Sequence, residues 1–312
     1  MGMNSLGWIV PSHKPRIEYL STMIESFNKY SFGVDLIIVW SYKTDSLKVK
    51  KIEENANVKH IYLDDFFSTN DIFLMEKTRS IINIKKLLAV QQFYMYYKGL
   101  VCTDDEVEFY RRFTGDSVIE HFLNQKFFPA TNVSKVKSKD DILAKILAEC
   151  IKFLPNESER KYLKSKTGDL SVFSWFSDLP YYDSNKVKSF LESFSLSQPS
   201  SLLKLSFHTF DHILYQFYCI LNYDYEYYVF EWDYKKIGIY NWFECFHLST
   251  YDTSYAKEYQ GKFSPLWCSS SELKSIFFSS FCLFHIDRAN NTVSKAKKIR
   301  YHLKEIVNQL KI

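Results

Sequence analysis

Three acidic residues in a row, Asp104, Asp105 and Glu106, follow directly after the apolar residues 100–102. Adjacent carboxylates repel one another unless a cation or a hydrogen-bond donor compensates for their charge. Carboxylate oxygens suit Mg²⁺ and Mn²⁺, which proteins usually hold with one or two carboxylates together with phosphate oxygens of the substrate. The cluster therefore indicates either a divalent metal site or a solvated acidic turn, which is the commoner use of such a triplet.

A second polar segment, Pro11, Ser12, His13 and Lys14, follows the first apolar run of the chain. At this position Lys14 could reach a diphosphate through charge-assisted hydrogen bonds. Basic residues in a loop are more often solvated. The segment is therefore a candidate phosphate site, and the alternative is an ordinary solvated loop.

The elements expected around these segments form a parallel α/β sheet. Residues 6–11 are predicted as a strand, 16–30 as an amphipathic helix, and 34–40 as a continuous apolar strand of the kind that is buried on both faces. In an open α/β sheet, ligands bind at the carboxyl ends of the strands, near the point where the strand order reverses. We therefore expect residues 11–14 and 104–106 to lie at the same edge of the sheet.

Further helices and strands alternate along the rest of the chain. A long helix is predicted over 76–97, ended by Lys98 and Gly99, because glycine is the usual residue just after a helix. The other predicted helices are 46–55, 140–153, 184–194, 210–222 and 292–310, the other strands are 60–63, 100–102, 168–176, 225–232, 237–240 and 276–286, and 195–201 is predicted as a loop.

Composition excludes several classes. Of 312 residues, 56 are aromatic (27 Phe, 23 Tyr and 6 Trp) and only 15 are Gly or Pro, which rules out disordered and collagen-like chains. Forty Lys and Arg against 36 Asp and Glu give a net charge of +4, too small to indicate a nucleic-acid partner. No long apolar run or secretory signal is found, which predicts a cytoplasmic protein, and six widely spaced cysteines predict reduced thiols.

Three stretches of the N-terminal half resemble glycosyltransferases of the GT-A fold. They are WIVPS at 8–12 followed by a helix, LIIVWS at 36–41 followed by Thr44 and Asp45, and the Lys85-containing helix that leads into CTDDEVEF at 102–109. The last stretch is similar to the DxD element of these enzymes, with Asp104 in the first place and Glu106 in the second. Because Glu is longer than the usual Asp, either Glu106 or Asp105 is expected to be the second metal ligand.

This resemblance implies both a fold and a reaction. The fold class is α/β and GT-A-like, one domain over 1–312 in which 6–110 form a Rossmann-type nucleotide-sugar half with a mixed sheet, 111–290 an acceptor half, and 291–312 a basic helix. The reaction is transfer of a sugar from a nucleotide-sugar donor to a saccharide or lipid-linked acceptor in bacterial surface glycan synthesis. Mn²⁺ or Mg²⁺ is the implied cofactor.

The resemblance also implies roles for residues of the nucleotide-sugar half. Pro11, Ser12, Lys14 and Lys85 are expected at the nucleotide diphosphate, and Asp45 near the base or ribose. The alternative for Asp45 is an ordinary turn residue. For Lys85 and the adjacent Lys86, the alternative is that they lie on the solvated face of their helix.

A weaker similarity covers DLPYY at 178–182 and FDHILY at 210–215. In inverting members of the fold, an acid that opens such a helix is the general base, a place that Asp211 matches. The equal alternative is that Asp211 caps the helix. His285 matches a histidine near the C-terminus of many members of the fold that contacts the metal or the diphosphate. The alternative is a histidine at a strand end that is hydrogen-bonded to backbone. His247 is the other candidate for the same role.

Other function classes remain open from the sequence alone. The same acids could serve a divalent-metal nuclease or phosphoryl-transfer enzyme, and the aromatic surface could make the chain a non-catalytic adaptor. A phosphate-binding GxxxxGK[ST] loop is absent, which argues against nucleoside triphosphate hydrolysis. Residues 292–312 carry an apolar stripe and six cations against one acid, so the predicted helix over 292–310 either packs on its own domain or contacts the anionic inner membrane.

Overall fold

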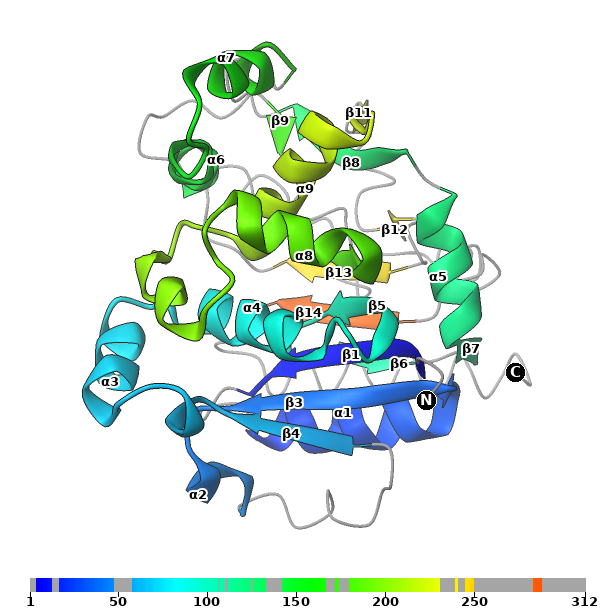
Figure 1. Ribbon diagram of the computed structural model, residues 1–312. Coiled ribbons are helices and arrows are strands. Elements are labelled where there is room, and N and C mark those ends of the chain that lie inside the picture. Colours follow the sequence, from blue (N-terminus) through cyan, green and yellow to red (C-terminus); the bar gives the residue numbers. More distant parts are fainter. Residues whose placement is uncertain are drawn as a thin grey trace.

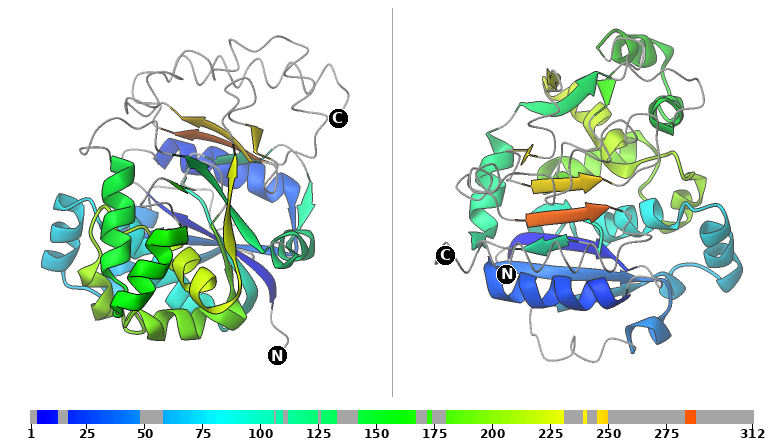
Figure 2. Two further views of the ribbon diagram at one scale, coloured as in Figure 1. Left: turned by 90° about the horizontal axis from the view of Figure 1, so that it is seen from above. Right: turned by 180° about the vertical axis from the view of Figure 1, so that it is seen from behind.

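A five-stranded sheet is the centre of the computed structural model, and helices cover both of its faces (Figures 1 and 2). The strand order is β10-β5-β1-β3-β4, with β5, β1, β3 and β4 parallel and β10 antiparallel to β5. These strands are β1 (Asn4–Pro11), β3 (Val34–Trp40), β4 (Val58–Tyr62), β5 (Tyr97–Cys102) and β10 (Tyr181–Asp183). The predicted α/β class and mixed sheet are therefore confirmed.

The structure describes most of the first 230 residues and three short strands beyond them. The described residues are 4–12, 17–47, 58–105, 107–109, 112–124, 126–132, 142–166, 172–173, 180–230, 239–240, 245–249 and 283–287. The predicted basic helix over 292–310 lies outside these ranges. In the described part of the chain, no helix is long and apolar enough to cross a membrane.

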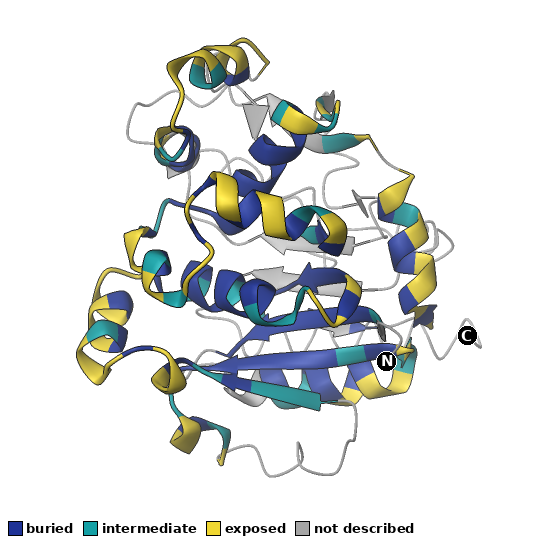
Figure 3. Cartoon of the chain, in the orientation of Figure 1, coloured by how far each residue is buried: buried dark blue, intermediate teal, exposed yellow. Residues whose placement is uncertain are grey.

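Helices α1 and α4 lie on opposite faces of the sheet. Because they cover both faces, the central strands are rich in apolar residues. Helix α1 (Ile17–Tyr30) packs on one face, where Trp8 and Ile38 belong to its core cluster. Helix α4 (Ile81–Phe93) packs on the other face, where Ile9 and Ile37 belong to a second cluster. Because successive strand residues point to opposite faces, a strand covered on both sides is mostly apolar, and Figure 3 shows β1 and β3 as buried along most of their length.

The other helices complete the two layers. Helix α5 (Gly115–Leu123) joins the α1 side, whereas helices α6 (Ile142–Lys152), α8 (Ser184–Ser193) and α9 (Asp211–Asn222) join the α4 side. Helices 140–153, 184–194 and 210–222 are thus confirmed, and α7 (Glu157–Lys166) was not predicted. The short elements are α2 (Lys43–Ser46), η2 (Leu63–Asp65), η4 (Pro199–Lys204), β2 (Ser31–Phe32), β6 (Val107–Phe109), β7 (Phe113–Thr114), β8 (Phe127–Asn132), β9 (Val172–Phe173), β11 (Glu226–Phe230), β12 (Ile239–Tyr240), β13 (Cys245–Ser249) and β14 (Leu283–Asp287).

The predicted long helix 76–97 is wrong, because two helices and the start of a strand occupy this region. Helix α3 (Thr69–Lys77) ends before Arg79, whose φ of 62° lies in the left-handed region, and α4 begins two residues later. Gly99 lies inside β5 rather than after a helix. A Cβ on Gly99 would come within 2.6 Å of the Tyr181 ring, so the glycine allows close packing between adjacent strands.

The predicted helix 46–55 is also placed differently. Helix α2 ends at Ser46 instead of beginning there, and residues 48–57 lie outside the described ranges. The helical turn of α2 is instead formed by Lys43, Thr44, Asp45 and Ser46.

Candidate functional site at the ends of β1 and β5

The strand order reverses between β1 and β5. From β1 the chain builds outward to β3 and β4, and it then returns to the other side of β1 as β5. Ser12 follows β1, and Thr103, Asp104 and Asp105 follow β5. The backbone N–H of Thr103 donates to the Ile9 carbonyl at 3.0 Å, so pairing of the two strands continues to this edge. The described residues of the two expected segments, Pro11 and Ser12 and then Asp104 and Asp105, therefore follow adjacent strands at one edge of the sheet.

The end of β1 is fixed by hydrogen bonds on both sides. The backbone N–H and the Oγ of Ser12 both donate to the carbonyl of Val39 in β3 at 2.9 Å. The Lys85 Nζ donates to the Ser12 carbonyl at 2.7 Å, and Lys85 is only 2% exposed. The solvated-face alternative is wrong for Lys85, whose ammonium binds the end of the strand. Pro11 is buried, and Lys14 lies outside the described residues.

Asp104, the first acid of the cluster, is paired with Lys86. The Lys86 Nζ lies 2.9 Å from the Asp104 Oδ1, with the two side chains 13% and 37% exposed. Burial alone would lower the pKa of Lys86, but the carboxylates of Asp104 and Asp211 outweigh it and raise that pKa above its usual value. Lys86 is therefore an internal cation and not part of a solvated face.

The loop that carries the acidic cluster is anchored in the core. The indole Nε1 of Trp8 donates to the Thr103 Oγ1 at 2.8 Å, and the N–H of Cys102 donates to the Pro180 carbonyl at 2.9 Å. Asp105 is buried, whereas Asp104 is partly exposed. Glu106 lies outside the described residues.

Asp211 is buried beside this cluster at the first turn of α9. The N-cap of the helix is Phe210, which makes no side-chain cap, so the helix-cap alternative for Asp211 is wrong. Asp211 is 1% exposed and accepts a hydrogen bond from the Tyr182 hydroxyl through its Oδ2. Burial raises the pKa of Asp211, although the Lys86 ammonium and the Tyr182 hydroxyl oppose that shift.

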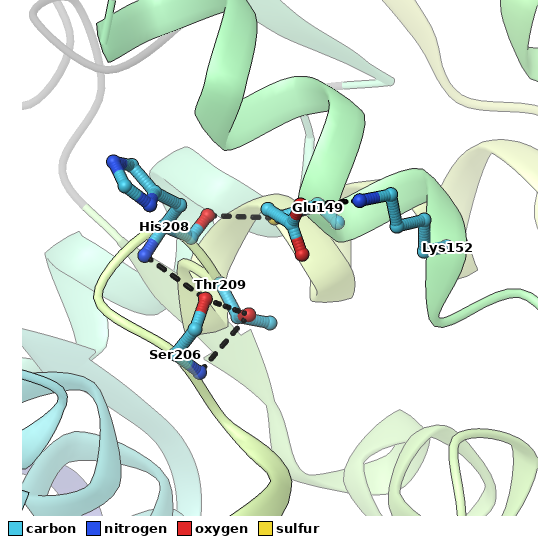
Figure 4. Close-up of polar contacts among 6 residues, drawn as sticks. Glu149, Lys152, Ser206, His208 and Thr209 are labelled. Atoms are coloured by element: carbon cyan, nitrogen blue, oxygen red, sulfur yellow. Dashed lines mark hydrogen bonds and ion pairs between the residues drawn. The ribbon is translucent and has the colours of Figure 1, made fainter. Parts of the chain in front are cut away.

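A tight turn that includes Ser206, His208 and Thr209 precedes α9 (Figure 4). The Thr209 Oγ1 accepts from the Ser206 N–H at 3.2 Å, and the two hydroxyls are 2.9 Å apart. The Cys150 Sγ of α6 lies 3.7 Å from the His208 carbonyl, and the Asn83 Nδ2 of α4 donates to the Ser206 carbonyl at 3.1 Å. Helices α4 and α6 thus fix where α9 begins.

His212, next to Asp211, lies within the electrostatic influence of Lys86 and Asp104 and was not singled out in the sequence analysis. Its Nδ1 is buried and has no hydrogen-bond partner among the residues that the structure describes. Burial and the Lys86 ammonium lower the pKa of His212 to about 3, so the imidazole is neutral at physiological pH. The sequence analysis named Lys86 only as a solvated-face residue, and it did not predict the contacts of Lys86 with Asp104 or of Tyr182 with Asp211. The available signal was two lysines inside an otherwise apolar helix, where charges have to be paired.

The remaining predicted residues are only partly described. Asp45 is buried in α2, after β3, at the same edge of the sheet. Strand β14 runs antiparallel to β6 with His285 opposite Val107, so its backbone lies beside the strand that follows the acidic cluster. His247 is opposite His285 in β13. Within the described ranges, no three His, Cys, Asp or Glu residues are grouped to hold a metal ion.

Comparisons with known proteins give only distant similarities. No protein-family profile and no curated protein matches the chain. Among solved structures, the apo form of mouse xyloside xylosyltransferase 1 is 11% identical with a TM-score of 0.44, over 94% of this chain and 100% of that one. The apo WbbM bifunctional glycosyltransferase is 11% identical with a TM-score of 0.43, over 90% of this chain and 45% of that one. At these values neither similarity assigns an activity to this chain.

Proposed function

We propose that the chain is a glycosyltransferase that moves a sugar from a nucleotide-sugar donor to an acceptor hydroxyl. The observation that carries this proposal is the reversal of strand order between β1 and β5, with Ser12 at one strand end and Asp104 at the other. Nucleotides bind at this place in open α/β sheets. Ser12, Pro11, Lys14 and Lys85 would line the diphosphate end of the donor, and Asp45 its base or ribose.

We propose that a divalent ion, Mn²⁺ or Mg²⁺, binds at the acidic end of β5. Asp104 is a partly exposed carboxylate at a strand end, and hard cations of this kind prefer carboxylate oxygens. Asp104 would hold the ion with Glu106 or Asp105 as the second ligand, and His285 as a further one. When bound, the ion neutralises the charge of the diphosphate leaving group.

Asp211 is the proposed general base, which takes the proton of the acceptor hydroxyl. Its raised pKa favours this role, because a base works best when its pKa approaches the working pH. The role also requires the acceptor to reach a carboxylate that is covered in the structure. Tyr182 would keep the second oxygen of that carboxylate oriented through its hydrogen bond.

The proposal also covers the acceptor and the cellular location. We assign the chain to bacterial surface glycan synthesis, with a saccharide or a lipid-linked acceptor, in the cytoplasm at the inner membrane. Support comes from the six cations of residues 292–312, since each cation near an anionic bilayer adds about 1 kcal/mol of attraction. Deleting residues 292–312 should abolish salt-sensitive binding to anionic liposomes and leave the melting curve of the rest intact.

The catalytic part is tested by donor turnover. The full chain is incubated with UDP, GDP and CMP sugars plus Mn²⁺, and release of the free nucleotide is followed with and without saccharide acceptors. We expect release from one nucleotide class, stimulated by an acceptor and lost in EDTA. Cleavage of nucleic acid, or of the nucleotide portion itself with no sugar transfer, would instead indicate a nuclease or phosphoryl-transfer enzyme.

A further inference from the structure

Lys86 occupies the position that links the two carboxylates of the site. Its ammonium is 2.9 Å from Asp104, and its charge also acts on Asp211 and His212. The four groups come from three places in the sequence: Lys86 from α4, Asp104 from the end of β5, and Asp211 and His212 from the start of α9. The Lys86 ammonium, whose side chain is largely covered, therefore interacts with all three of the other groups, beside the point where the strand order reverses between β1 and β5.

The position of Lys86 matters for any metal that Asp104 binds. A lysine ammonium is cationic at neutral pH, and this one lies against the very carboxylate that is proposed as the first metal ligand. A divalent ion on Asp104 would meet a like charge at close range in a poorly hydrated place, where charges interact strongly. The ammonium and the metal ion therefore compete for the same carboxylate.

We propose that Lys86 is the resident counter-cation of Asp104, which a divalent metal has to displace, and that Lys86 thereby keeps metal affinity low in the substrate-free protein. This inference rests on the proposed function, because it takes Asp104 as a metal ligand. Lys86 has a flexible four-carbon stem, so its ammonium can leave Asp104 while its backbone stays fixed in α4. Among the described residues, the carboxylate of Asp211 also interacts with its charge.

The experiment measures Mn²⁺ binding to the full chain by the loss of the free-ion EPR signal, without nucleotide. The test variant is Lys86→Gln, which keeps a hydrogen-bond donor and removes the charge. We expect it to bind Mn²⁺ at least about tenfold more tightly than wild type, the scale expected for deleting one like charge next to the ion. Lys86→Arg should bind as weakly as wild type, because the positive charge remains.

Matched variants separate this effect from net charge and from folding. Lys98→Met removes one cation from the other end of β5, where its side chain is largely exposed, and should leave Mn²⁺ affinity unchanged. Asp104→Asn in the Lys86→Gln background should abolish the gain. Melting curves accompany every variant, and Lys86→Met is the substitute if Lys86→Gln does not fold.

The outcomes distinguish this inference from the proposed function. Mn²⁺ binding that depends on Asp104 but is unchanged or weakened in Lys86→Gln overturns the inference and leaves the metal site standing. Absence of Mn²⁺ binding in wild type and in both Lys86 variants up to millimolar ion overturns the inference and the metal part of the proposed function together. Tighter binding that survives Asp104→Asn places the ion elsewhere and also overturns the inference.

Discussion

A single lysine, Lys86, connects the acids that the sequence marks as chemically interesting. The sequence predicts Asp104 and Asp211 as candidates because of their positions after a strand and at the start of a helix. It does not predict that Lys86 joins them, because pairing between residues far apart in the chain depends on how α4 and α9 pack. Likewise, the pattern around Asp211 fits a base and a helix cap equally, and the structure shows that Phe210, not Asp211, is the N-cap.

Removing a proposed metal ligand should abolish metal-dependent chemistry. We expect Asp104→Asn and Glu106→Gln each to remove most donor turnover, because each deletes a negative ligand of a hard cation. Steady-state turnover across Mn²⁺ concentrations measures this effect. Asp105→Asn is the matched variant that decides which acid is the second ligand. Wild-type turnover in Asp104→Asn and Glu106→Gln would contradict the metal assignment.

Asp211→Asn separates a catalytic role from a structural one. Nucleotide-sugar affinity should persist while transfer falls by roughly two to four orders of magnitude, the usual range for losing a general base. Calorimetric binding and single-turnover transfer measure the two quantities. Tyr182→Phe, which keeps the carboxylate and removes its hydrogen-bond donor, should have a smaller effect on transfer. A joint loss of affinity, transfer and melting temperature in Asp211→Asn would make the residue structural.

His212 should make the fold sensitive to acid. Its pKa is about 3 in the folded protein and near 6.5 when unfolded, so the unfolded chain binds the proton first as pH falls. Stability from His212 is therefore present above pH 6.5 and is lost as pH falls toward 3, with a slope approaching about 1.4 kcal/mol per pH unit. Urea unfolding at several pH values should show that the free energy of unfolding falls less steeply with decreasing pH in His212→Gln than in wild type. Equal slopes in both proteins would refute this prediction.

Secondary structure was predictable where periodicity is strong and uninterrupted. The strands at 6–11 and 34–40 and the helices at 140–153, 184–194 and 210–222 follow directly from apolar spacing. The break between α3 and α4 was not predictable, because Arg79 adopts a left-handed conformation that its residue type does not favour. Gly99 was misread for a related reason, since its lack of a side chain serves packing against Tyr181 rather than a helix end.

Gly115, at the start of α5, tests how this helix is docked. A Cβ there would lie 2.1 Å from the Ser5 Oγ and 2.7 Å from the Gly33 carbonyl oxygen, which is backbone and cannot rotate away. We expect Gly115→Ala to lower the unfolding free energy by about 1–3 kcal/mol, as overpacking does. Asp116→Ala, on the exposed side of the same turn, is the control and should stay within about 0.5 kcal/mol of wild type. Comparable urea midpoints for the two variants would show that the helix start can shift freely.

At the scale of the whole molecule, the order of the strands creates the site. Apolar strands and intervening helices predict a parallel sheet, but they do not reveal that β5 returns beside β1 or that β10 adds an antiparallel edge. That order depends on the lengths of the connections and on which faces the helices cover. It brings Ser12 and Asp104, more than 90 residues apart in sequence, to adjacent strand ends.

The most direct test of the central claim is equilibrium binding of nucleotide sugars at this edge of the sheet. The melting temperature of the full chain is measured with a panel of UDP, GDP and CMP sugars in Mn²⁺, for wild type and Asp104→Asn. A ligand that binds only the folded state at 100 times its Kd stabilises it by about 2.7 kcal/mol, which is a readily measured shift. We predict a shift with one nucleotide class in wild type that is lost in Asp104→Asn. No shift with any donor, or an equal shift in both proteins, would contradict a donor site at the ends of β1 and β5.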